Sequence, residues 1–409
     1  MTTMQNGPAP QTAPGTPSPG PGRINGYATG VLAVVGMELR QRLRSRGWYI
    51  MLVIWFGLIW LVTALTWISW KAQSNYQTDF GGIGQDAAVV GPGPLIFEAV
   101  LAFVLLFGLL VAPAFSANAI SGDRAAGTLA IMQVTLLRPG QLLWGKFLAS
   151  WFAALAFLVV SVPFLIFGIA QGGLGAGYIL VALLLLAIEL GVVCALGVGI
   201  SALANRPLFS IVVTYLTVAA LAFGTLIAFG LGMMLSNGTV AANQMHYKGA
   251  EMYQGEPDSG LEDNEKEMYP APPRPADITD ENAEYACFGP LVEQPAPRSE
   301  RVAWMLGMNP FVVVADAIPY PERSATSTQY YSTGLFESIS QGARYAQAGP
   351  EATYMCANGK VVTGYLEQKL PLWPLGLGLQ LLVAAGILAL GWRALRTPAG
   401  KLPKGTRVA

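Results

Sequence analysis

The stretch Ile120–Lys146, ISGDRAAGTLAIMQVTLLRPGQLLWGK, decides how the rest of the chain is interpreted. It is a polar-flanked segment enclosed by two apolar segments, each long enough to cross a lipid bilayer. Leu129, Met132 and Leu136 fall at three- and four-residue spacing, which predicts a short helix with one apolar face. Such a helix can dock in a groove on a soluble protein and pass a displacement to both spans. On composition alone, an interfacial loop-helix without a partner fits equally well.

The composition is that of a membrane protein. Hydrophobic residues make up 53% of the chain and charged residues 12%, and the apolar residues occur in long blocks rather than at amphipathic spacing. Because a hydrocarbon core about 30 Å thick requires roughly 20 apolar residues of helix, we expect an all-α membrane protein. Six blocks meet this requirement: Trp48–Trp70, Leu95–Ala117, Phe147–Ala170, Tyr178–Leu203, Leu208–Leu235 and Leu370–Trp392.

The distribution of lysine and arginine predicts the orientation of these spans. Short basic flanks stay in the cytoplasm, and six spans place both termini on the same side. Only Lys71 marks a short loop on the opposite face. We therefore expect a multi-pass plasma-membrane protein with both termini in the cytoplasm. The basic residues on the inner side are Arg40, Arg42, Arg44, Arg46, Arg124, Arg138, Lys146, Arg206, Arg393, Arg396, Lys401, Lys404 and Arg407.

The segments outside the spans differ in character. Residues 1–26 are rich in Pro, Gly, Thr and Ser, which predicts a disordered cytoplasmic tail. Residues 27–46 combine an apolar face with four arginines, which predicts an amphipathic helix in the cytoplasmic interface; a simple basic anchor is the alternative. The remaining divisions are spans one to five at 47–235 with the polar helix at 120–137, the sixth span at 370–396 and a basic cytoplasmic tail at 397–409.

The extracytoplasmic segment, residues 236–369, is long and acidic. It contains 18 acidic and 9 basic residues. Cys287 and Cys356 both lie in it, where oxidation is permitted, so we expect them to pair; two free thiols are the alternative. Residues 301–319 are apolar enough to touch the membrane but too short to cross it, which predicts a re-entrant or interfacial helix.

Two features within the fourth span leave alternatives open. Glu189 lies near the middle of the span, where an ionised carboxylate costs several kcal/mol unless it faces protein or a wet cavity. It has a role in a pathway or interface, or it is a buried, hydrogen-bonded carboxyl, charged or neutral. Gly191, Ala195 and Gly199 recur at four-residue steps, which favours close helix packing within the subunit or in a dimer.

The residues required for several kinds of chemistry are missing from the sequence. There is no Gly-x-x-x-x-Gly-Lys-Ser/Thr phosphate loop. His246 is the only histidine, which leaves no basis for a Cys/His metal site or a Ser-His-Asp triad. The net charge is zero, so nothing suggests nucleic acid. We therefore expect no catalytic residues, no metal and no cofactor on this chain, and if it moves anything uphill, the energy must come from a partner.

Several motifs resemble the signature of type-two ABC exporter permeases. That family has Glu-Arg, Gly-Thr-Leu, a turn containing proline and a closing Gly-Lys, and this chain has Asp123-Arg124, Gly127-Thr128-Leu129, Arg138-Pro139 and Gly145-Lys146 without insertion. Ala130 and Leu136 depart from the usual Glu and Pro. In addition, Glu38–Arg46 is similar to the family's elbow helix, and Asn309-Pro310-Phe311 resembles a turn before its last span.

The resemblance implies a non-catalytic permease subunit that couples ATP hydrolysis elsewhere to export. Its partners would be two copies of a cytoplasmic ABC ATPase carrying ATP and Mg, a second permease subunit of the same or another kind, and membrane lipids. Asp123 and Arg124 would be polar contacts to the ATPase, and Leu129 and Met132 would be apolar anchors. The full set of implied coupling residues is Asp123, Arg124, Gly127, Thr128, Leu129 and Met132.

A second class of function remains open. The size and acidity of residues 236–369 also fit an envelope-assembly or sensing protein that acts through this segment, with the spans as an anchor. An intramembrane enzyme would need paired catalytic groups at one depth, and Glu98 and Glu189 offer no such pair.

Overall fold

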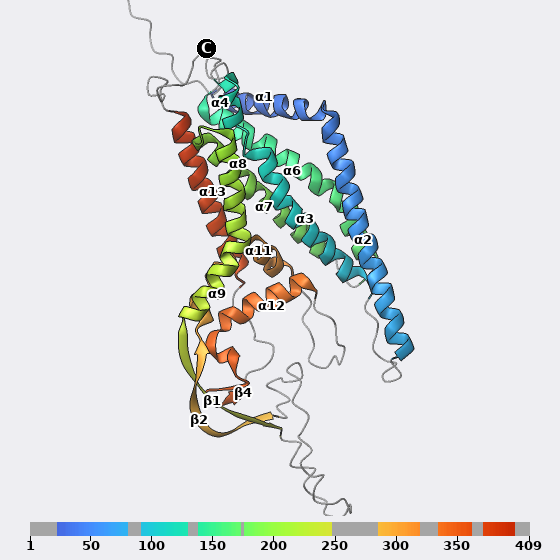
Figure 1. Ribbon diagram of the computed structural model, residues 1–409, viewed down its shortest axis with the longest axis vertical. Helices are drawn as coiled ribbons and strands as arrows, with labels where there is room; N and C mark the ends of the chain where they lie inside the picture. Colours follow the sequence, from blue (N-terminus) through green and yellow to red (C-terminus); the bar gives the residue numbers. More distant parts are fainter. Residues whose placement is uncertain are drawn as a thin grey trace, which may run out of the picture.

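The computed structural model of the chain describes residues 23–80, 91–129, 138–172, 176–247, 285–319, 334–361 and 371–396. A bundle of long helices stands between two unlike ends (Figure 1). One end carries α1 (Arg23–Leu43) and α4 (Ser121–Ala125), and we refer to it as the α4 end. The opposite end carries a small β-sheet, and we refer to it as the sheet end.

Six helices in the described ranges are long and apolar enough to cross a membrane. They coincide with the six apolar blocks of the sequence, so the prediction of six spans is confirmed. The helices are α2 (Arg46–Phe80), α3 (Gly93–Ser116), α6 (Pro139–Ala170), α7 (Ala176–Leu203), the continuous helix formed by α8 (Pro207–Ala219) and α9 (Thr225–Leu235), and α13 (Trp373–Leu395).

Helix α1 lies across the α4 end, at a wide angle to α2 (Figure 1). It begins at Arg23, so residues 23–26 belong to this helix and not to the tail predicted from composition, while residues 1–22 lie outside the described ranges. The glycine-rich composition did not indicate the start of α1, because local sequence does not reveal contacts with a distant helix such as α6. The helix ends at Leu43, and a turn leads directly into α2.

Contacts with α6 hold α1 in place. Gln141 Nε2 donates hydrogen bonds to the carbonyls of Gly26 and Tyr27, at 3.3 and 3.2 Å. Gly145 faces Val34, and a Cβ atom on this glycine would lie 2.6 Å from the Val34 Cβ. Only glycine therefore permits the observed spacing of the two helices at this point, and α1 is attached to the bundle through α6.

The small residues of α7 pack inside the subunit. Gly199 faces α13, where an added Cβ would lie 3.0 Å from the backbone carbon of Ile387. Gly191 faces α6, where an added Cβ would lie 3.2 Å from Trp151 Nε1. Ala195 is 5% exposed. Of the two interpretations of this stripe, the structure supports packing within the subunit.

A π-helical turn at Ala220–Gly224 interrupts the fifth span between α8 and α9. The buried side chain of Asn309 donates to the carbonyl of Ala222 at 2.7 Å, and its Oδ1 accepts from the backbone N–H of Phe311 at 2.9 Å. The same amide therefore satisfies the π-turn and caps α11 (Pro310–Ala317). The Asn-Pro-Phe turn thus joins the segment at residues 236–369 to the fifth span.

The segment at residues 236–369 contains β-structure, so the expectation of an all-α protein is wrong there. Four strands form an antiparallel sheet in the order β2-β1-β3-β4. They are β1 (Asn237–Tyr247), β2 (Tyr285–Pro297), β3 (Cys356–Ala357) and β4 (Lys360–Val361). The two long strands pair across a long separation in sequence, and neither has the regular alternation of polar and apolar residues that marks a half-buried strand.

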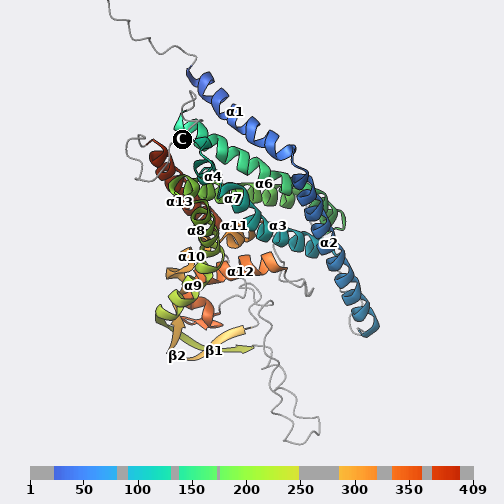
Figure 2. The ribbon, with the colours of Figure 1, turned by 45° about the horizontal axis from the view of Figure 1, so that its top comes forward.

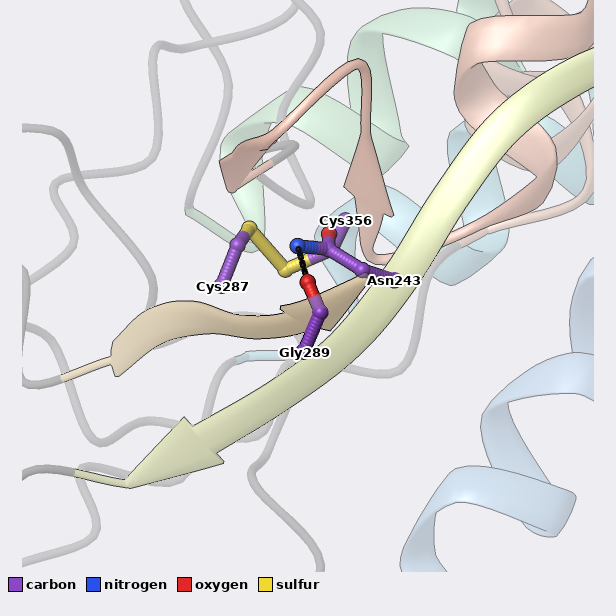
Figure 3. Close-up of a disulfide and its surroundings, with 4 residues drawn as sticks. All are labelled: Asn243, Cys287, Gly289 and Cys356. Atoms are coloured by element: carbon purple, nitrogen blue, oxygen red, sulfur yellow. Dashed lines mark hydrogen bonds between the residues drawn. A yellow bond between two sulfur atoms is a disulfide. The ribbon is translucent and has the colours of Figure 1, made fainter. Parts of the chain in front are cut away.

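A disulfide fixes this sheet. Cys287 of β2 and Cys356 of β3 are joined with an S–S distance of 2.04 Å, and their strands flank β1 on opposite sides (Figure 3). Next to it, Asn243 Nδ2 donates to the carbonyl of Gly289 at 3.4 Å, where β2 bulges. The pairing links two segments that are 69 residues apart in the chain.

Three short helices connect the sheet to the spans. They are α10 (Ala303–Gly307), α11 and α12 (Leu335–Ala348). Where the sequence predicted one re-entrant or interfacial helix at 301–319, the chain forms α10 and α11, and Val313 and Val314 of α11 are fully buried. Helix α11 packs against α7, α12 and α13. Both views place α12 between the spans and the sheet (Figure 2).

Glu98 of the second span caps α12 from outside that helix. Its Oε2 accepts a hydrogen bond of 3.0 Å from the backbone N–H of Phe336, in the first turn of α12. A carboxylate is favourable there because the N–H groups at a helix start carry partial positive charge. Gly334, the N-cap residue, lies directly against this carboxylate.

Replacing Gly334 with alanine is expected to destabilise the packing of α12 by about 1–3 kcal/mol, because the new Cβ would overlap the Glu98 carboxyl group. Gly342 is the matched control, since it lies in the same helix with open space around it. Alanine there should instead stabilise the helix by about 0.5–1 kcal/mol. Thermal unfolding of the two purified variants measures the difference, and equal midpoints would contradict the predicted overlap.

Asp316 of α11 is another buried carboxylate, at 2% exposure. Its Oδ2 accepts from the backbone N–H groups of Leu372 and Trp373 at 2.6 and 3.1 Å, which caps the start of the sixth span. Its Oδ1 accepts from Arg344 Nε at 2.9 Å and from Ser340 at 3.3 Å, both in α12. One side chain therefore ties α11, α12 and α13 together.

Candidate functional site at the α4 end

The segment after the second span forms a compact turn at the α4 end. Helix α3 ends at Ser116, a turn follows, and α4 spans Ser121–Ala125. Gly127 adopts a φ of +76°, a left-handed conformation that favours glycine. Residues 130–137, the second half of the helix predicted at 120–137, lie outside the described ranges.

A buried lysine joins three elements at this end. Lys146 Nζ of α6 lies 2.5 Å from Glu38 Oε1 of α1 and 2.5 Å from Asp123 Oδ2 of α4. The lysine side chain is 5% exposed, and the two carboxylates are 14% and 26% exposed. A buried cation between two carboxylates holds them in place strongly, because the removal of one partner leaves uncompensated buried charge. We refer to these three residues as the Lys146 junction.

Arg124 joins α4 to the connection between the fourth and fifth spans. Its guanidinium donates to the carbonyls of Ala204 and Ala202 at 2.7 and 3.1 Å, and to Asn205 Oδ1 at 3.2 Å. These carbonyls lie at the C-terminal end of α7, where a positive charge is favourable. Arg124 therefore contacts the subunit itself, although the sequence resemblance suggested a contact with a partner.

Ser201 makes a second connection between α4 and α7. Its Oγ accepts hydrogen bonds from the backbone N–H groups of Ile120 and Ser121, at 3.0 and 2.9 Å. These donors lie at the start of α4, where the helix itself supplies no acceptor. With Arg124 and the Lys146 junction, this makes α4 a rigid part of the bundle.

Leu129 points into the subunit. It is 7% exposed and belongs to a cluster of buried residues from α6, α7 and α13 that includes Leu142, Val198 and Leu395. Its side chain is therefore not available as the docking anchor suggested by the sequence resemblance. An apolar position at helical spacing is typical of a contact with either a partner or the protein's own core, and here the core contact forms. Met132, the second suggested anchor, lies outside the described residues.

The solvent-facing part of this segment is a short run of small residues. Ala125, Ala126, Gly127 and Thr128 are all exposed. Thr128 Oγ1 donates back to the carbonyl of Asp123 at 3.2 Å, which closes the turn. We refer to residues 125–128 as the exposed turn. It is fixed to the bundle through Asp123 and Arg124, and small side chains permit close approach of another protein.

The sequence matches a known family of membrane proteins. The family described as ABC-2 family transporter protein matches residues 32–268, more than half of the chain. The chain belongs to this family. No curated protein matches the sequence. An ABC-2 permease is the membrane component of an ABC transporter, which decides between the two classes of function left open by the sequence and implies association with an ABC ATPase subunit.

Glu189 and the cysteine pair of this ABC-2 permease lie away from the exposed turn. Glu189 is fully buried near the middle of α7, and the disulfide is in the sheet end. The structure therefore brings together Asp123, Arg124, Gly127, Thr128 and Leu129 but separates them from Glu189 and the two cysteines. No group of three or more potential metal ligands occurs within the described ranges.

Two other features of the α4 end, at Arg42 and Glu38, were not evident from the sequence. Arg42 belongs to the helix predicted for the cytoplasmic interface, but its guanidinium lies 5.0 Å from the ring centre of Phe115 and donates to the Phe115 carbonyl at 3.3 Å. Burial lowers the pKa of this guanidinium. Glu38, which pairs with Lys146, is the other feature. A single negative charge among several arginines was the signal in the sequence that could have indicated a specific ion pair.

Proposed function

We propose that this ABC-2 permease is the membrane subunit of an ATP-driven exporter in the plasma membrane, with the α4 end in the cytoplasm. Two copies of a separate ABC ATPase, which bind ATP and Mg, would act on a dimer of permease subunits. The excess of arginine and lysine at this end supports the orientation. Family analogy supports the direction of transport.

The observation that carries the proposal is the way α4 is attached. The exposed turn is anchored through Asp123 to α1 and α6, and through Arg124 and Ser201 to the end of α7. A displacement of this turn by the ATPase would therefore reach α1 and the two spans α6 and α7 at once, because paired and largely buried side chains connect them to α4. In this mechanism, ATP closes the two ATPase subunits, the turn moves with them, and the spans rearrange to open a path outward.

The roles that we propose for the coupling residues differ from those that the sequence resemblance implies. The exposed turn, Ala125 to Thr128, would meet the ATPase, with Gly127 allowing close backbone approach. Asp123 and Arg124 would transmit the movement rather than contact the partner. Leu129 would keep the turn seated on the bundle through its buried contacts.

A bulky substitution in the exposed turn tests this proposal. In Ala126→Trp, the large side chain is expected to prevent docking of the ATPase, so ATPase activity copurifying from native membranes should fall at least tenfold. The subunit should still reach the membrane with unchanged thermal stability, because Ala126 is exposed. Ala126→Ser is the matched control and should behave as the native protein does.

Two results would contradict the proposal in different ways. If Ala126→Trp retains a full complement of active ATPase, the exposed turn is not the docking site. If the native protein copurifies with no ATP-hydrolysing subunit from its own membranes, the proposed exporter itself is wrong.

A further inference from the structure

Glu189 has an unsatisfied carboxyl group in the interior of the bundle. The residue is 0% exposed and lies near the middle of α7. Within the described ranges, neither of its carboxyl oxygens has a hydrogen-bond partner. An ionised carboxylate in such a place costs several kcal/mol, and a buried acceptor without a donor is also unfavourable. The carboxyl group of Glu189 therefore requires a hydrogen atom that can complete a hydrogen bond.

Gln380 of α13 is the polar side chain beside Glu189. It is 1% exposed, and its Nε2 donates to the carbonyl of Met308 at 3.0 Å. A carbonyl can only accept, so this bond fixes the orientation of the amide, with the NH₂ group toward Met308. Gln380 Oε1 is then a second buried acceptor, and among the described residues it also has no partner.

We propose that Glu189 carries a proton in this conformation and that its hydroxyl donates to Gln380 Oε1. A single proton, taken up from water, removes the buried charge and supplies the donor that both side chains lack. The resulting hydrogen bond joins α7 and α13, the fourth and sixth spans. We refer to this pair as the Glu189–Gln380 latch.

The surroundings of Glu189 contain no compensating cation in the described part of the chain. Each charged or titratable side chain of the helices packed against α7 is engaged elsewhere or lies at a helix end. These side chains are Glu98 at the start of α12, Lys146 and Asp123 in the junction, Arg124 at the end of α7, Asp316 at the start of α13, Tyr215 on the carbonyl of Leu110, and Arg393 and Arg396 in the last turns of α13; Cys194 of α7 itself faces the carbonyl of Ala112.

The latch makes the contact between α7 and α13 dependent on protonation. Glu189 is 0% exposed, so the closed packing of the bundle keeps water from its carboxyl group. Any rearrangement that separates these spans exposes the carboxyl to water, where it would lose its proton. Movement of the two spans is therefore accompanied by proton release on opening and proton uptake on closing. This inference does not depend on the identity of the energy source.

Infrared spectroscopy of the purified full-length protein at neutral pH tests the proton directly. A protonated carboxylic acid has a carbonyl band that is resolved from carboxylate bands. The difference between native protein and Glu189→Gln should contain such a band, and Gln380→Leu should shift it because the acceptor is lost. Thermal unfolding adds a second measurement: Glu189→Gln should keep the native midpoint, since an amide can donate to Gln380, whereas Glu189→Leu should lower it.

Each alternative has a distinct outcome. Absence of the acid band from the difference spectrum would show an ionised Glu189 and overturn the proposal. A band that does not change in Gln380→Leu would overturn the latch. A thermal midpoint of the native protein that rises with sodium or potassium, and no longer does so in Glu189→Gln, would indicate a bound cation in place of the proton and would also overturn it.

Discussion

Replacing Lys146 with methionine is expected to destabilise the α4 end by about 3–5 kcal/mol, the usual cost of leaving a buried charge without its partner. The loss would leave the carboxylates of Glu38 and Asp123 facing each other without a cation. Thermal unfolding of the purified protein measures the effect on stability. In the proposed mechanism the same variant also loses coupling, because α4 is no longer joined to α1 and α6.

The matched control neutralises the partners as well. In a triple variant, Lys146→Met with Glu38→Gln and Asp123→Asn, no charge remains unpaired, so much of the stability should return. The coupling should stay impaired, because the strong connection between the three elements is still absent. If the single variant Lys146→Met kept native stability and native coupling of ATP hydrolysis to transport, the Lys146 junction would not have the role proposed here.

Replacing Asp316 with alanine is expected to have a comparable effect, about 3–5 kcal/mol, at the opposite end of the molecule. The substitution removes the acceptor for the N–H groups of Leu372 and Trp373 and leaves Arg344 without its carboxylate. Helices α11, α12 and α13 lose a shared contact. Limited proteolysis of the segment at residues 236–369 and the thermal midpoint should both report the loss.

Arg344 supplies the control for this prediction. Its side chain is 39% exposed, so the ion pair seen from its side is partly screened by water. Arg344→Ala should therefore cost much less than Asp316→Ala, which also loses the two backbone contacts at the start of α13. Equal effects would show that the ion pair, and not the helix cap, is the main contribution of Asp316.

The spans were predictable from the sequence because the bilayer imposes a simple requirement. Every crossing helix needs a long apolar stretch, and the chain satisfies it six times with little ambiguity. The signature around Asp123 and Lys146 was also visible, because its residues follow one another in one continuous segment. What the sequence did not reveal is the direction in which each side chain points.

Leu129 and Glu38 illustrate why the sequence does not reveal where a side chain points. An apolar residue on a short helix fits a partner groove or the protein's own core, and only the packing of α6, α7 and α13 selects the core. Glu38 and Lys146 are 108 residues apart, so their pairing depends on how α1 crosses α6. The sheet was missed for a related reason, since β1 and β2 pair across a long separation.

The sidedness of the exposed turn is the most direct test of the account. Cys194 is buried and the other two cysteines are bonded, so the native protein offers little to a membrane-impermeant thiol reagent. We predict that Ala126→Cys is labelled only after the cells are permeabilised, while Gln341→Cys in α12 is labelled in intact cells. Labelling of Ala126→Cys in intact cells would place the turn outside and contradict its coupling to a cytoplasmic ATPase.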